Sequence, residues 1–217
     1  MEIRNFKTSL VIPISYIHLQ QQADVPVVIL FHGYADSAKS FLKRALPEIP
    51  KGIEVLAING PFPVPQRNGE EWKHAYAWYF SDPKTKTVLI PPSAAVQAVE
   101  NLLAELNLTS RRKILVGFSQ GGFFVPHLLS KLSNVEKTLI IGAAYRSHDY
   151  PESLLAPVDG LHGARDEVIS AELATNSFRD FSGKNPKGEL SVLEDMGHEL
   201  NDSGRSWIMQ KLNETAE

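Results

Sequence analysis

Hydrophobic residues along the chain gather in short continuous runs that end at glycine or a small polar residue. The clearest runs are residues 25–33 (VPVVILFHG) and 113–119 (KILVGFS). Such runs are typical of strands buried on both faces of a parallel sheet. A further buried strand is predicted at 53–61, other strands at 137–145 and 188–195, and a weaker one at 156–163. An extended edge strand or hairpin is expected within 10–19.

Between these runs the apolar residues recur with a helical period. The clearest amphipathic stretch is residues 93–108 (SAAVQAVENLLAELNL), which Pro91 and Pro92 precede. Other helices are expected at 37–46, 120–132, 171–181 and 202–212. Strands that alternate with helices predict an α/β fold, with a mostly parallel central sheet and helices on both faces. The length fits a single domain over residues 1–217.

Residues 61–90 break this alternation. They are rich in proline and in aromatic residues, among them Trp72, Trp78 and Tyr79, and they show no clear period. We interpret them as an irregular excursion over the top of the sheet, where binding surfaces usually lie. Its exposed aromatic residues are also compatible with a homodimer contact.

Composition excludes several classes of function. The net charge is −3 and basic residues are scattered, so we expect neither nucleic acid nor an anionic membrane as a partner. The absence of cysteine excludes disulfides, thiolate metal sites and cysteine nucleophiles. Neither a signal-peptide pattern nor a membrane-spanning apolar stretch is present, which makes a cytoplasmic location the default expectation.

Polar residues follow several of the predicted strands, at the end of a parallel sheet where ligands and catalytic groups collect. Ser119, Asp166 and His198 follow three of them, in the chain order that is expected of α/β-hydrolases. His32 also stands at a strand end, where we expect it to shape the turn through hydrogen bonds.

Ser119 lies in the pattern Gly-x-Ser-x-Gly, formed by residues 117–121 (GFSQG). The bare pattern is weak evidence, but here a buried strand precedes it and a helix is expected to follow. Such a turn holds a serine in strained geometry and presents its hydroxyl as a nucleophile. The structural alternative is a plain strand–helix turn in which the serine caps the helix.

A serine nucleophile needs a base and an acid. His198 follows the last strand and comes after the acid, so it is the candidate base, with a helix-capping histidine as the alternative. The other histidines are assigned to structural or solvated positions: His18, His32, His74, His127, His148 and His162. Asp166 is the candidate acid; the fallbacks are Asp159, Asp149 and Asp195.

Acyl transfer also needs donors that stabilise the oxyanion. The backbone N–H of Gln120, at the start of the helix after Ser119, is one candidate. The N–H of Tyr34, in the loop after the strand at 25–33, is the other, unless Tyr34 only packs on the excursion at 61–90. Since the backbone acts in both cases, the identity of these side chains is expected to matter little.

Four stretches in order, VVILFHGYADS, VGFSQGG, HGARDEVIS and MGHEL, resemble the phospholipase/carboxylesterase family of α/β-hydrolases. This resemblance implies an α/β-hydrolase fold without a large cap, and hydrolysis of carboxylic esters or thioesters with neither cofactor nor metal. It assigns Ser119, Asp166 and His198 to a triad. It likewise assigns the amides of Tyr34 and Gln120 to an oxyanion hole.

The stretch AWYFSD resembles the aromatic stretch that the family places near the acyl site, so Trp78 and Tyr79 are expected to line the substrate pocket. The chain departs from the family pattern at three places. Tyr34 stands where a small or aliphatic residue is usual, and Asp82 comes two residues later than the pattern. Asp159 and Gly160 stand where apolar residues are expected.

These observations favour a serine hydrolase that cleaves small-molecule esters with short to medium acyl chains through an acyl-enzyme. An acyl-protein thioesterase or a lysophospholipase is the alternative within the same chemistry. A catalytically silent hydrolase fold used for binding is the alternative from another class. A metal-dependent hydrolase is disfavoured, because no two histidines stand four residues apart.

Overall fold

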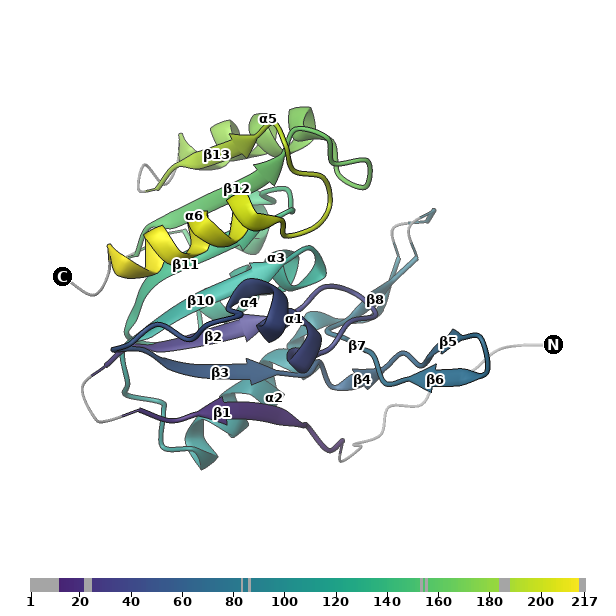
Figure 1. The fold of residues 1–217 in the computed structure, drawn as a ribbon, viewed down its shortest axis with the longest axis vertical. Helices are drawn as coiled ribbons and strands as arrows, with labels where there is room; N and C mark the ends of the chain where they lie inside the picture. Colours follow the sequence, from purple (N-terminus) through teal and green to yellow (C-terminus); the bar gives the residue numbers. More distant parts are fainter. Residues whose placement is uncertain are drawn as a thin grey trace.

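A seven-stranded sheet forms the centre of the computed structural model, which describes residues 12–21, 25–82, 84–85, 87–152, 154, 156–183 and 188–214. The strand order is β1-β3-β2-β10-β11-β12-β13 (Figure 1). All neighbours are parallel except β1, which pairs antiparallel with β3 at one edge. The strands are β1 (Tyr16–Leu19), β2 (Val27–Phe31), β3 (Glu54–Ile58), β10 (Lys113–Phe118), β11 (Val135–Ile141), β12 (Val158–Gly163) and β13 (Leu190–Leu193).

Helices cover both faces of this sheet (Figure 1). One face carries α1 (Ala38–Ala45) and α6 (Asp202–Asn213). The other face carries α2 (Pro92–Glu105), α3 (Gln120–Phe124), α4 (Pro126–Leu129) and α5 (Ala171–Ser182). The α/β fold with a mostly parallel sheet, expected from the sequence, is therefore confirmed.

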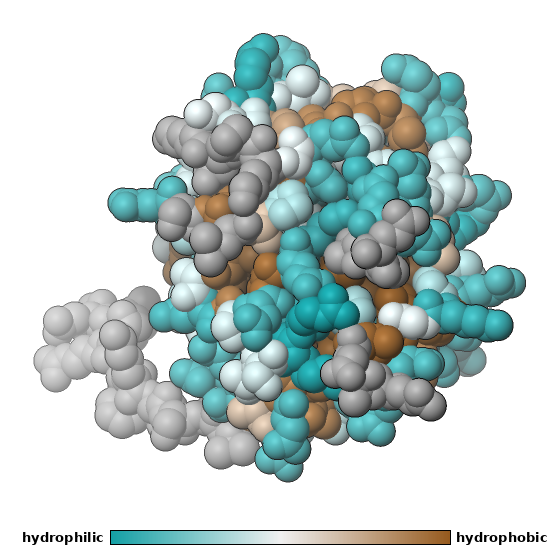
Figure 2. Space-filling model, turned by 90° about the vertical axis from the view of Figure 1, so that its left-hand side faces the viewer, coloured by the Kyte–Doolittle hydropathy of each residue, from teal (hydrophilic) through white to brown (hydrophobic). Residues whose placement is uncertain are grey.

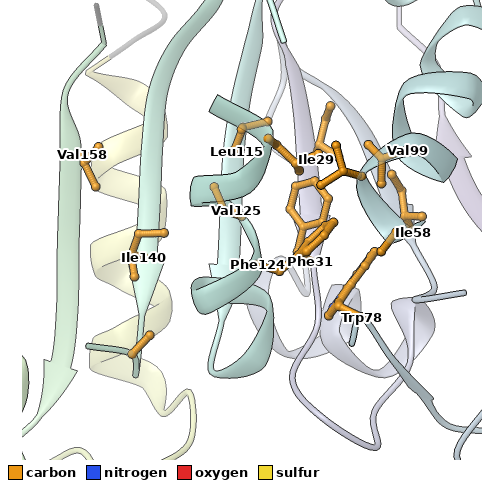
Figure 3. Packing of buried hydrophobic residues seen from close by; sticks show 14 of the residues in the cluster. Ile29, Phe31, Ile58, Trp78, Val99, Leu115, Phe124, Val125, Ile140 and Val158 are labelled. Atoms are coloured by element: carbon orange, nitrogen blue, oxygen red, sulfur yellow. The ribbon is translucent and has the colours of Figure 1, made fainter. Parts of the chain in front are cut away.

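The central strands divide their side chains between two cores, because successive side chains of a strand point to opposite faces. In β2, Ile29 and Phe31 join the core beneath α2 and α3, whereas Val28 and Leu30 join the core beneath α1 and α6. Figure 3 shows the first core, in which Phe31 lies beside Phe124 and Trp78. All five residues of β2 are buried, which explains the continuous apolar run in the sequence.

Residues 61–90 are more regular than expected. They form three small antiparallel strand pairs that lie beyond the carboxyl end of the sheet (Figure 1). These pairs are β4 (Phe62–Pro63) with β7 (Tyr76–Ala77), β5 (Gln66–Asn68) with β6 (Glu71–Lys73), and β8 (Phe80–Ser81) with β9 (Val88–Ile90). Strands of two or three residues are too short to show an alternating pattern, so sequence reasoning misses them.

One expected helix needs correction. The single helix expected at 120–132 is two short helices, α3 and α4, with a break before Pro126. Proline has no N–H to donate to the preceding turn, which explains the break. The edge strand expected within 10–19 is observed as β1 (Tyr16–Leu19), while residues 10 and 11 of the expected range lie outside the described part of the chain.

Asp159 and Gly160, the unusual residues of β12, have structural roles. The Asp159 carboxylate lies 3.5 Å from the ammonium of Lys211 on α6 and accepts a hydrogen bond from the Glu189 N–H at 3.0 Å. At Gly160, a Cβ atom would lie 2.0 Å from the Tyr145 hydroxyl oxygen, so any other residue would force the Tyr145 side chain to move. Within the described ranges, no helix is both long and apolar enough to cross a membrane.

Candidate active site

Ser119 occupies a sharp turn between β10 and α3. Its backbone is strained, with φ of 51° and ψ of −117°, a conformation that costs about 1–3 kcal/mol in a residue other than glycine. The turn is also crowded: a Cβ at Gly121 would lie 2.0 Å from the Phe31 carbonyl oxygen, and one at Gly117 would lie 2.6 Å from that of Gly121. The glycines of the GFSQG motif are therefore required for β2, β10 and α3 to approach one another.

A continuous hydrogen-bonded chain joins the three strand-end residues that the sequence singles out. The Nε2 atom of His198 lies 2.9 Å from Oγ of Ser119, and its Nδ1 atom lies 2.7 Å from Oδ2 of Asp166. The Asp166 side chain is completely buried, and that of His198 is about one-fifth exposed. An imidazole held between a carboxylate and a hydroxyl is placed to take the hydroxyl proton.

The structural alternatives for these residues do not hold. The Ser119 side chain makes no capping hydrogen bond to α3. Asn201, rather than His198, caps α6, by accepting a hydrogen bond from the Gly204 N–H.

The fallback acids lie elsewhere. Asp159 is paired with Lys211, Asp195 accepts a hydrogen bond from the Ser203 hydroxyl, and Asp149 lies 3.4 Å from His148. Of the four aspartates considered, Asp166 is the one in contact with His198.

The loops that carry the acid and the base are packed against each other. Gly163 ends β12, three residues before Asp166, and a Cβ there would lie 2.3 Å from the carbonyl oxygen of Met196. The Arg165 N–H also donates to the Met196 carbonyl, at 3.0 Å. Two loops from distant parts of the sequence thus meet through backbone contacts, which fixes Asp166 relative to His198.

His32 shapes the loop after β2, as the sequence predicts. It is completely buried; its Nδ1 atom lies 2.6 Å from the Gly33 carbonyl oxygen, and its Nε2 atom accepts from the Gly60 N–H at 2.9 Å. A carbonyl only accepts, so the proton of the neutral ring is on Nδ1. Burial lowers the pKa of His32 to about 4, against the opposing effect of the Gly33 hydrogen bond.

The same loop carries Tyr34 and Ala35. Tyr34 is 54% exposed, and its ring packs edge-on against Phe80 of β8. Ala35 has φ of 53°, a left-handed conformation that residues with a Cβ rarely adopt. Gln120 is the first residue of α3, where the N–H groups of the first turn have no partner within the helix. Gln120 thus directly follows Ser119, and a Cβ at Gly33, the residue before Tyr34, would lie 3.5 Å from Cβ of Ser119.

The side chain of Gln120 matters more than the sequence suggested. Its Oε1 atom accepts from the Trp78 N–H at 3.0 Å, and its Nε2 atom donates to the Tyr79 carbonyl at 3.0 Å. This paired contact ties the segment between β7 and β8 to the residue next to Ser119. The residues involved lie about forty positions apart in the sequence, so no local signal reveals the contact.

Trp78 and Tyr79 differ sharply in their surroundings. Trp78 is completely buried, stacks on Phe124 with ring centroids 4.7 Å apart (Figure 3), and donates from Nε1 to the His32 carbonyl at 2.8 Å. It therefore supports the loop after β2 from within the core, and its burial does not fit the expected pocket lining. Tyr79 is half-buried; burial raises its pKa, Arg146 opposes the rise and Asp149 adds to it.

In the described part of the chain, no group of three or more His, Cys, Asp or Glu side chains could hold a metal ion. The site consists of a hydroxyl, an imidazole and a carboxylate joined in a chain, at the start of α3. That arrangement provides a nucleophile, a base and an acid that orients the base.

Comparison with known proteins agrees with this chemistry. A family model described as phospholipase/carboxylesterase matches residues 13–215. Curated protein sequences give no match. Similar solved structures include esterase PE8 (TM-score 0.70, 18% identity, covering 93% of this chain and 98% of that one). They also include acyl-protein thioesterase 2 of Zea mays (TM-score 0.69, 13% identity, covering 94% of this chain and 99% of that one). A third is a Bacillus cereus carboxylesterase (TM-score 0.63, 11% identity, covering 94% of this chain and 95% of that one).

Proposed function

Since the chain belongs to the phospholipase/carboxylesterase family, we propose that it is a serine hydrolase that cleaves carboxylic esters through an acyl-enzyme on Ser119. The observation that carries this proposal is the hydrogen-bonded chain from Asp166 through His198 to the Ser119 hydroxyl. A binding protein has no need of that chain, nor of the strained backbone that presents the serine.

In the first half-reaction, Ser119 Oγ attacks the acyl carbon while its proton moves to Nε2 of His198. The Nδ1–H of His198 donates to Asp166, which stabilises the imidazolium that forms. His198 then gives the proton to the leaving alcohol oxygen as the ester C–O bond breaks, and the acyl group stays on Ser119.

In the second half-reaction, a water molecule replaces the alcohol. His198 takes a proton from the water as its oxygen attacks the acyl-enzyme, and returns that proton to Ser119 Oγ as the carboxylic acid leaves. The N–H groups of Gln120 and Tyr34 stabilise the oxyanion in both steps. Their place beside Ser119, on the start of α3 and on the loop after β2, supports this role.

We further propose that short to medium acyl chains are preferred. In the aromatic stretch AWYFSD, the Trp78 side chain is taken up by the core, which leaves two half-buried rings, those of Tyr79 and Phe80. Two partly exposed rings offer a long acyl chain little apolar surface.

The test is a series of nitrophenyl esters from acetate to palmitate, with Ser119→Ala and a matched control, Ser206→Ala, on the exposed side of α6. We expect a rate maximum at short to medium chains. In Ser119→Ala, kcat is expected to fall by about 10⁴- to 10⁶-fold, and the protein no longer reacts with a serine-directed phosphonate. Ser206→Ala retains the wild-type rates. Hydrolysis that persists in Ser119→Ala would contradict the assignment of the nucleophile.

Thioester hydrolysis is the second candidate, favoured by the similarity of the whole fold to a solved acyl-protein thioesterase. Oxygen esters and thioesters of the same acyl group distinguish the two functions. A higher kcat/KM for the thioester, or a rate maximum at palmitate, would replace the carboxylesterase proposal by a thioesterase.

A further inference from the structure

His162 is a buried neighbour of the candidate acid, Asp166. It belongs to β12, its side chain is completely buried, and its Nε2 atom lies 2.8 Å from the Ile169 carbonyl oxygen. The same atom lies 3.4 Å from Oδ2 of Asp166. Because a carbonyl oxygen can only accept, Nε2 carries the proton. This N–H thus bonds to Ile169 and also faces the carboxylate.

The two oxygens of Asp166 divide their partners clearly. Oδ1 accepts from the backbone N–H groups of Val168 and Ile169, at 2.9 and 2.8 Å. Oδ2 accepts from Nδ1 of His198, and His162 approaches this same oxygen. At 3.4 Å the approach is longer than an ordinary hydrogen bond, so it acts as an electrostatic contact in a site that excludes water.

His162 also fixes the loop that carries the acid. Ile169 donates its N–H to Asp166 and accepts at its carbonyl from His162, so residues 162–169 form a closed ring of contacts. The base's loop is packed on the same strand end, at Gly163. A shift of this ring would therefore change the geometry between Asp166 and His198.

The second nitrogen of His162 separates its role from that of His198. Among the described residues, Nδ1 of His162 has no hydrogen-bond partner although it is buried. A proton on Nδ1 would be an unpaired buried donor, whereas a proton on Nε2 is paired with the Ile169 carbonyl. His162 thus donates a hydrogen bond from Nε2, whereas His198 has partners at both ring nitrogens.

We propose that His162 is a positioning residue for the hydrolase reaction: through Ile169 and Oδ2 it holds the Asp166 carboxylate in the orientation that His198 requires. The inference rests on the proposed triad and extends it by one residue that touches neither substrate nor reacting atoms. It predicts that His162 affects catalysis only while Asp166 is present.

A double-mutant cycle tests this dependence, with wild type, His162→Leu, Asp166→Asn and the double variant compared on one nitrophenyl ester. We expect His162→Leu to lower kcat by about 10- to 100-fold with KM little changed, as for a small misplacement of a catalytic group. Asp166→Asn is expected to lower kcat by about 10⁴-fold. The double variant should be no slower than Asp166→Asn. A full multiplication of the two losses would overturn the inference while leaving the triad intact.

A pair of milder variants guards against a His162→Leu protein that does not fold. Gln can place an amide N–H near the position of Nε2, whereas Met has a similar length and no donor. With thermal unfolding showing that both are folded, His162→Gln should recover kcat relative to His162→Met. Equal kcat values in the two folded variants would overturn the proposal. Full activity in Asp166→Asn would instead refute the triad, and this inference with it.

Discussion

The two ends of the central sheet use buried polar groups in opposite ways. At the amino end, Glu54 is buried and contacts both His18 and Arg111, and Lys211 pairs with Asp159 and Glu189. Each of these groups is matched by opposite charge or by backbone. Figure 2, which views this end, shows hydrophilic residues over most of the described surface.

At the carboxyl end, the polar groups form a directed chain instead. Asp166 and His198 lead to the hydroxyl of Ser119, and His32 is held neutral beneath the neighbouring loop. Among the described residues at this end, Asp166 is the buried acidic side chain, and its Oδ2 atom faces His198, which in turn contacts Ser119. Charge pairing thus stabilises the fold at the amino end. At the carboxyl end, strained backbone lowers the stability but orients the nucleophile.

Left-handed backbone shows the same contrast. Away from the site, Asn107 and Asn134 adopt positive φ in the turns that lead into β10 and β11, and asparagine tolerates that conformation well. At the site, positive φ falls on Ser119 and Ala35, which have no such tolerance. Strain is therefore concentrated around the candidate nucleophile and its oxyanion loop.

The largest effect that separates the two ends is expected from Glu54→Leu. It leaves His18 and Arg111 without their buried partner, which is expected to lower the free energy of unfolding by about 3–5 kcal/mol. Since Glu54 lies at the far end of β3 from Ser119, kcat of the folded protein should be unchanged. Denaturant unfolding and ester hydrolysis measure the two quantities.

Glu136→Ala is the matched control for Glu54→Leu. Glu136 pairs with Arg112 on the surface, where an ion pair contributes at most about 1 kcal/mol. A fall in kcat with Glu54→Leu at temperatures where the protein is folded would show that the two ends are coupled.

The next effect is a pH dependence that arises at His32. Its pKa in the folded protein, about 4, lies below the 6.5 of the unfolded chain, so the unfolded state binds more protons between these values. Stability should therefore fall as the pH drops from about 6.5 to 4, by about 3 kcal/mol for this group. His32→Gln, which cannot titrate, should lose less stability over that range.

The comparison is made by denaturant unfolding at pH 7 and pH 4 in wild type and His32→Gln. Carboxylates contribute to both proteins, and the difference between the two isolates His32. His148→Gln is the control, because the His148 side chain is mostly exposed. An identical loss in wild type and His32→Gln would mean that His32 accepts a proton without cost in the folded state.

Several features of the carboxyl end of the sheet can be predicted from the sequence. Ser119 was predicted from the continuous apolar run that precedes it. Asp166 and His198 follow weaker runs, and they were predicted from their place at strand ends and their chain order after Ser119. The helix start after Ser119 was predictable from the same motif. The role of His32 followed from its place at the end of the most hydrophobic run.

What the sequence could not give depends on contacts between distant segments. The sequence AWYFSD does not indicate that the Trp78 side chain points into the core. Its orientation depends on packing against Phe31 and Phe124. The Gln120 side chain contacts the backbone of Trp78 and Tyr79 only because the fold brings the segment after β7 next to the start of α3. His162 resembled a simple strand residue, because its partner Ile169 is positioned by the turn at Asp166.

The smallest effect tests the strain at Ala35. Glycine adopts φ near 53° without the steric cost that a Cβ imposes, so Ala35→Gly should relieve about 1 kcal/mol of strain. Part of this gain is offset by the greater freedom of glycine in the unfolded chain, which leaves a net stabilisation of about 0.5 kcal/mol.

Asn107→Gly is the matched control, in the turn that leads into β10 at the amino end of the sheet. No gain is expected there, because asparagine already tolerates the conformation. Thermal unfolding of the two variants measures the difference. Stabilisation by Ala35→Gly with a lower kcat would show that the strained alanine holds the Tyr34 amide in place; a loss of stability would show that its methyl group packs well enough to outweigh the strain.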